Sequence, residues 1–164
     1  MTDTRLPSTR AHDTRSGPRT GRRMIRVLAG FAAGFVAVLL FHQGMLGLLH
    51  LAGLAARAPF QFHTVPPLGV PALLSSAFWG GVWGVALAGV APRFPTGARH
   101  WLAAAAFGAL GPTLVAWFVV APLKGLPSGG GWGFPGVLIG PLVNGAWGVG
   151  TALLLRALDR TARK

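Results

Sequence analysis

Four apolar blocks, each about as long as a bilayer is thick, constrain this chain more than any other feature. They cover residues 27–50, 71–91, 101–121 and 136–155. About 20 helical residues cross a hydrocarbon core of roughly 30 Å, because each residue advances a helix by about 1.5 Å. The segments between the blocks are rich in proline and glycine, as is typical of loops. The sequence therefore predicts an all-α membrane protein with four transmembrane helices.

The basic residues are distributed unevenly between the two sides of this predicted bundle. Of the 15 lysines and arginines, only Arg57 and Lys124 fall on one side. The others lie in the N-terminal segment, the loop after the second block and the C-terminal tail. Because positive charge is retained in the cytoplasm, we expect both termini to be cytoplasmic. The net charge of +12 is spread over tails and loops and forms no basic face, so we expect no nucleic-acid partner.

Composition divides the chain into three parts. Residues 1–23 hold few apolar groups and predict a disordered basic cytoplasmic arm. Residues 24–158 form the four-helix transmembrane domain, and residues 159–164 form a short basic tail. The arginines of the arm either bind anionic lipid headgroups or only set the orientation of insertion. Arginine outnumbers lysine, and alanine and glycine abound, which favours a bacterial chain in the inner membrane with the lipid bilayer as its first partner.

The second and fourth blocks resemble each other. Aligning Gly69 with Gly133 places "GVWGV" on "GAWGV", so that Trp83 meets Trp147. The first and third blocks match more weakly, with "VLAGFAAG" on "WLAAAAFG". One interpretation is a tandem repeat of two helical hairpins. The alternative is that helices rich in small residues look alike by composition alone.

Glycines recur at helical spacing within the blocks. In lipid, helices associate by close van der Waals contact, and small residues four apart mark such interfaces. We therefore expect the glycines to pack the four helices together or, as an alternative, to form the seam of a homo-oligomer. The helix-packing candidates are Gly30, Gly34, Gly80, Gly84, Gly136, Gly140 and Gly148.

A few polar side chains interrupt the apolar blocks, most visibly in "FHQGMLGLLH". Counting helical residues from the membrane edges places five of them at similar depth beneath the external surface. Polar groups in lipid face the bundle interior or a wet cavity and either serve function or join helices by hydrogen bonds. The candidate polar cluster consists of His42, Gln43, Ser75, Ser76 and Asn144. We expect Gln43 and Asn144 to converge, with His42 meeting the serines or a water-filled pocket.

The sequence offers little for catalysis. The three acidic residues, Asp3, Asp13 and Asp159, lie in the terminal segments, so no carboxylate is available in the membrane as a general base or metal ligand. The chain has no cysteine, which excludes disulfides and thiolate chemistry. No two histidines oppose each other at equal depth on facing helices, as a bound haem would require. We expect no catalytic residue, no metal and no cofactor, and the chain is interpreted as a non-enzyme.

Three segments together resemble a known group of proteins. These are "FHQ" in the first block, "VPPLGVP" in the external loop and "SSAFWGGVWG" at the start of the second block. From Met24 onward the chain resembles a group of small four-helix bacterial inner-membrane proteins that are described only as uncharacterised. The resemblance implies a four-helix topology and no activity. Two hypotheses follow: a non-enzymatic structural or accessory membrane component, with or without a membrane partner, or a small transporter or channel with a path near His42, Gln43 and Asn144.

Overall fold

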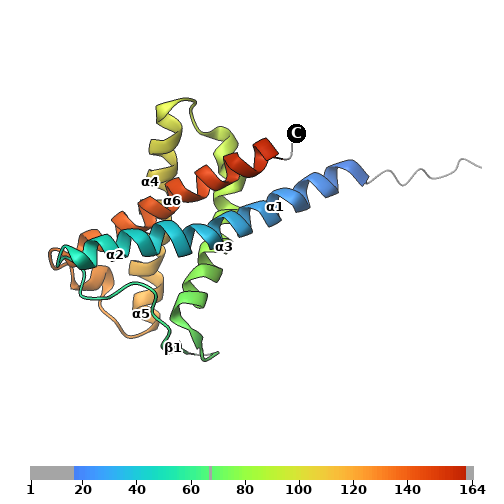
Figure 1. Ribbon diagram of the computed structural model, residues 1–164. Helices are drawn as coiled ribbons and strands as arrows, with labels where there is room; N and C mark the ends of the chain where they lie inside the picture. The colour runs from blue at the N-terminus through green and yellow to red at the C-terminus, as the bar shows by residue number, and fades with distance from the viewer. Residues whose placement is uncertain (1–16, 67, 162–164) are drawn as a thin grey trace, which may run out of the picture.

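The structure, a computed structural model, describes residues 17–66 and 68–161 (Figure 1). The prediction of four apolar helices is confirmed, because four helical spans are long and apolar enough to cross a bilayer. These spans are Thr20–Leu51, Ala72–Arg93, Ala98–Leu123 and Gly136–Thr161. Residues 1–16 of the predicted arm and residues 162–164 of the tail lie outside the described residues.

Two of the spans contain a π-helical turn. The first is built from α1 (Gly17–Ala37), the π-turn η1 (Val38–His42) and α2 (Gln43–Leu51). The second is α3 (Ala72–Val90) followed by the short η2 (Ala91–Arg93). The third joins α4 (Ala98–Val115), the π-turn η3 (Ala116–Val120) and α5 (Ala121–Leu123). The fourth is the single helix α6 (Gly136–Thr161), which is preceded by η4 (Ser128–Gly131).

The first and last helices extend beyond the apolar blocks. Helix α1 begins at Gly17, so residues 17–23 are helical where the sequence predicted disorder. Arginine is a good helix former, and Pro18 suits a first helical turn. The apolar block supplies the rest of the helix, so these turns propagate from a helix that already exists. Helix α6 likewise continues to Thr161, into the predicted tail.

The spans pack as two pairs. Helix α1 packs most extensively on α3, and α4 on α6, while α1 and α6 join the pairs and α3 barely touches α4. Figure 1 shows α1 and α6 side by side and running in opposite directions. The start of α1, the end of α6 and the turn between α3 and α4 lie toward one end of the bundle. The loops after α2 and α5 lie toward the other end.

Glycine contacts hold each pair together. A Cβ added at Gly84 would overlap the Gly30 carbonyl oxygen and lie 2.8 Å from the Gly34 Cα. In the second pair, a Cβ added at Gly148 would overlap the Ala104 carbonyl oxygen and lie 3.1 Å from the Gly108 Cα. The backbones therefore approach more closely than any larger side chain would allow, as expected where van der Waals contact drives association in lipid.

Six of the seven predicted packing glycines lie against another helix. A Cβ added at Gly140 would lie 3.1 Å from the methyl group of Thr113. The other five pack on the backbone or side chains of another helix: Gly30, Gly34, Gly80, Gly84 and Gly148. Gly136 has nothing within 4 Å of that place and is exposed. It begins α6, and the position of its missing Cβ touches no other helix among the described residues.

The loop between the first two spans is attached to the start of α3. Its strands β1 (Thr64–Val65) and β2 (Val70–Pro71) pair in antiparallel fashion. The N–H groups of Ala72 and Leu73 donate to the carbonyl oxygens of His63 and Gln61, both at 2.9 Å. Because the first N–H groups of a helix have no partner within the helix, these two bonds fasten the loop while capping α3.

Candidate functional site

Gln43 lies at the first turn of α2 and attaches a loop to the bundle. Its side chain is only 6% exposed, and its Oε1 accepts a hydrogen bond from the Phe60 N–H at 2.8 Å. Phe60 has a positive φ of 55°, a conformation that side chains other than glycine seldom adopt. The amide of Gln43 therefore satisfies a backbone donor at a bend of the loop between α2 and α3, and no hydrogen bond joins it to Asn144.

Asn144 joins the two helices of the second pair. Its Nδ2 donates to the Thr113 Oγ1 at 2.9 Å, and Thr113 is almost completely buried between α4 and α6. Sequence reasoning did not single out Thr113. It is the one hydroxyl side chain in the block 101–121, which is the signal that could have identified it.

The two serines of α3 do not join a polar cluster through hydrogen bonds. The Ser76 Oγ donates to the Ala72 carbonyl oxygen of its own helix at 2.9 Å and is exposed. Ser75 is half-buried and makes no side-chain hydrogen bond within residues 17–66 and 68–161. Back-bonding to the preceding turn is the common way for serine to satisfy its donor in an apolar helix.

His42 is the last residue of the π-turn η1. Its Nδ1 is buried and has no hydrogen-bond partner among the described residues. An unsatisfied buried nitrogen costs about 1–3 kcal/mol unless a water or another polar group reaches it. His42 is therefore the one predicted site residue with a buried side-chain atom that lacks a hydrogen-bond partner among the described residues, and π-turns recur at functional sites.

Trp147 links the two helix pairs at the centre of the bundle. It is 2% exposed, and its indole Nε1 donates to the Gly34 carbonyl oxygen of α1 at 2.9 Å. One turn further along α6, the buried Thr151 donates to the Trp147 carbonyl oxygen at 2.8 Å. A buried indole N–H requires an acceptor, and α1 provides one here.

Trp83 holds the corresponding place on α3 but contacts its neighbour more loosely. Its ring lies over Gly111 and meets Phe107 edge-on, with the ring centroids 6.0 Å apart. The Trp83 ring is half-buried, and its N–H has no hydrogen-bond partner within the described ranges. This difference agrees with the tight packing of α1 on α6 and the thin contact between α3 and α4.

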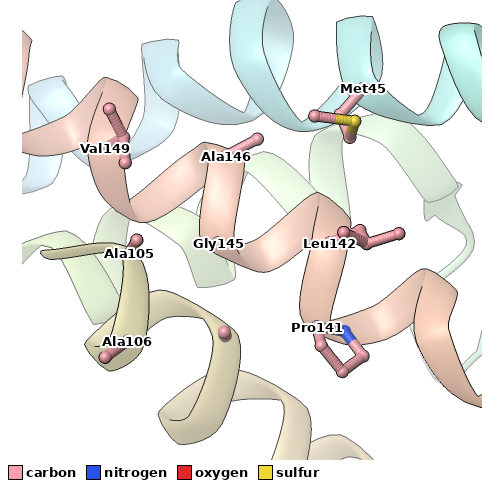
Figure 2. Close-up of a pocket in the computed structure, with 9 residues that line it drawn as sticks. Met45, Ala105, Ala106, Pro141, Leu142, Gly145, Ala146 and Val149 are labelled. Atoms are coloured by element: carbon pink, nitrogen blue, oxygen red, sulfur yellow. The ribbon is translucent and has the colours of Figure 1, made fainter. Parts of the chain in front are cut away.

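A shallow groove of about 420 Å³ runs along α4 and α6. Figure 2 shows Met45 of α2 beside it, with small and aliphatic residues of α4 and α6 along its walls. The lining residues are Met45, Ala105, Ala106, Ala109, Pro141, Leu142, Gly145, Ala146 and Val149. None of these side chains can form a hydrogen bond other than through a weak sulfur acceptor, so the groove is unsuited to a polar solute.

The described histidines and acids do not gather into a metal site. Within residues 17–66 and 68–161, no three His, Cys, Asp or Glu residues lie close enough together to hold a metal ion. His50 lies near the end of α2, and the Ala55 carbonyl oxygen accepts a hydrogen bond from its Nδ1 at 2.8 Å. Comparison with protein-family models, curated proteins and solved structures gives no match for this chain.

Proposed function

We propose that this chain is a non-enzymatic structural or accessory component of a bacterial inner membrane. The observation that carries the proposal is the use of its buried polar groups. Gln43 holds a loop, Asn144 joins α4 to α6, and Trp147 joins α6 to α1. Side chains that are already bonded within the fold stabilise the bundle and are not free to bind a passing solute.

The proposed orientation places both termini in the cytoplasm. It is supported by the excess of arginine and lysine on the side of the termini and the α3–α4 turn, because such residues resist translocation. We expect reporter fusions within residues 60–66 and 125–131 to be active only outside the cytoplasm. Fusions within residues 93–99 should be active only inside it. A cytoplasmic signal from residues 60–66 would refute this orientation.

Two copies of one helical hairpin account for the pattern of contacts. The alignment that pairs "VLAGFAAG" with "WLAAAAFG" places Gly34 on Gly108, and the alignment of the other two helices places Gly84 on Gly148. The corresponding close contacts are Gly34 with Gly84 and Gly108 with Gly148. The same crossing therefore occurs at aligned positions in both helix pairs, which supports a duplicated hairpin over a chance likeness of small-residue helices.

Truncating Asn144 tests the structural role directly. We expect Asn144→Ala to lower the free energy of unfolding by about 1 kcal/mol, because one interhelical hydrogen bond is lost. Ser76→Ala is the matched control, since Ser76 bonds only its own helix, and it should unfold with the native protein. Reversible unfolding in detergent micelles measures both. Equal stability of Asn144→Ala and the native protein would remove the interhelical role of Asn144.

The second candidate function, a small transporter, rests on His42 alone. Its Nδ1 is buried without a hydrogen-bond partner in the described ranges and is a place where a proton or water could bind within the membrane. If the role is structural, we expect proteoliposomes containing the native protein to conduct no more protons than empty vesicles. Proton flux that disappears in a folded His42→Phe variant would establish the transporter instead.

A further inference from the structure

Each of the four spans carries one arginine at nearly the same distance along its helix from a helix crossing. Arg26 precedes Gly34 by eight residues and Arg156 follows Gly148 by eight. Arg93 follows Gly84 by nine residues, and Arg99 precedes Gly108 by nine. Because these glycines mark the two helix crossings, each arginine lies about 12–14 Å along its helix from a crossing. All four lie toward the end of the bundle where α1 starts and α6 ends, and we call them the arginine belt.

The height of the belt corresponds to the edge of a bilayer. Half of a hydrocarbon core is about 15 Å, so crossings at mid-membrane place the four Cα atoms just inside the edge. The long side chains then carry their guanidinium groups outward to the phosphate level. Trp101 lies beside the belt. Its ring centroid is 5.5 Å from that of His100 and 5.8 Å from the guanidinium carbon of Arg156. Aromatic rings of this kind are enriched at the membrane–water interface.

No acidic residue in the described part of the chain neutralises the belt. All four arginines are exposed, and none forms an ion pair within residues 17–66 and 68–161. Arg93 donates to the Gly89 carbonyl oxygen of its own helix at 3.2 Å, and Arg156 lies over the Trp101 ring. These contacts position two guanidinium groups without cancelling their charge. Asp159 is the only acidic residue in the described part of the chain.

The charge is concentrated at this end of the bundle. Arg22 and Arg23 on α1 and Arg160 on α6 continue the basic surface outward from the belt and are also exposed. The loops at the opposite end contain Arg57 and Lys124. A surface with so many unpaired guanidinium groups at phosphate height is complementary to a membrane leaflet rich in anionic lipid.

We propose that the arginine belt binds the phosphate groups of anionic phospholipids in the leaflet at this end of the bundle. Guanidinium groups donate two parallel N–H bonds to phosphate oxygens, and the belt presents one such group from each span. The protein thereby gathers anionic phospholipids around itself in preference to zwitterionic ones. This inference adds a lipid specificity to the proposed structural role and does not depend on that role being correct.

The experiment uses the full chain reconstituted in vesicles of phosphatidylcholine with increasing phosphatidylglycerol. Quenching of tryptophan fluorescence by brominated lipids measures the relative binding constant of the two lipids. We expect the native protein to prefer phosphatidylglycerol, and Arg26→Gln/Arg156→Gln to reduce this preference about fivefold for each arginine removed. The charge-preserving variant Arg26→Lys/Arg156→Lys should retain most of the preference, which also controls for folding.

The matched control is Arg57→Gln/Lys124→Gln, which removes two positive charges from the opposite end. It should leave the preference for phosphatidylglycerol unchanged. An equal loss in this control, or no preference in the native protein, would overturn the proposal. Inorganic phosphate is added in a separate arm at the ionic strength of a chloride control. If inorganic phosphate binds to the native protein in phosphatidylcholine vesicles and phosphatidylglycerol shows no preferential binding, the belt binds a free anion and the lipid proposal fails.

Discussion

Replacing Gly84 with leucine is expected to destabilise the folded state of this protein strongly. The new Cβ alone would overlap the Gly30 carbonyl oxygen and lie 2.8 Å from the Gly34 Cα. Overpacking a core usually costs about 1–3 kcal/mol because side chains can move aside. Here the obstacle is the backbone of α1, so the two helices must separate. We expect a loss of at least about 3 kcal/mol, at or beyond the upper end of that range.

Gly89 provides the control on the same helix. It is exposed and has nothing within 4 Å of the place of its missing Cβ, and leucine is a better helix former than glycine by up to about 1 kcal/mol. Gly89→Leu should therefore be as stable as the native protein or slightly more stable. Thermal unfolding followed by far-ultraviolet circular dichroism compares the two variants. If Gly84→Leu melted with the native protein, or Gly89→Leu lost as much stability, the close helix crossing would be refuted.

The four helices were predictable because lipid imposes a length and an apolar composition on every span. The first and last residues of the helices were less predictable. Helix α1 starts at Gly17, ten residues before the apolar block at Val27. Hydrophobicity reports which residues lie in the bilayer, whereas a helix continues into water as long as its residues favour the helical conformation. The arm was therefore predicted as disordered up to a point where the chain is already helical.

The packing glycines were largely predictable because spacing by four residues places them on one face of a helix. Gly108 was missed because its neighbour on that face is Ala104, so α4 carries no run of glycines. Gly136 was included because it continues the spacing of Gly140. Spacing identifies the face of a helix but does not locate the helix crossing along it.

The partners of the polar residues could not be read from the sequence. Residue counts place Gln43 and Asn144 at similar depth, yet Gln43 bonds Phe60 and Asn144 bonds Thr113. The π-turn η1 ends at His42 and rotates the residues that follow it relative to regular α-helical spacing. The loop that contains Phe60 also returns to the bundle and supplies a backbone donor. Neither feature leaves a signal in the hydrophobic pattern.

The most direct test of the two-pair architecture is a disulfide between α4 and α6. A Cβ at Gly145 would lie 3.6 Å from the Ala109 Cβ, within the range of about 3.5–4.5 Å found across disulfides. The chain has no cysteine of its own, so the double variant Ala109→Cys/Gly145→Cys contains only this pair. The control is Leu110→Cys/Gly145→Cys, because Leu110 is 58% exposed and is turned about 100° from Ala109 around the helix.

The measurement is the gel mobility of each variant after mild oxidation in native membranes, with and without reductant. The two-pair architecture predicts that most of the Ala109→Cys/Gly145→Cys protein forms an intramolecular disulfide, whose mobility shift is reversed by reductant. The Leu110→Cys/Gly145→Cys control should form little or none. The absence of a disulfide in the first variant, or an equal yield in the control, would contradict the packing of α4 on α6.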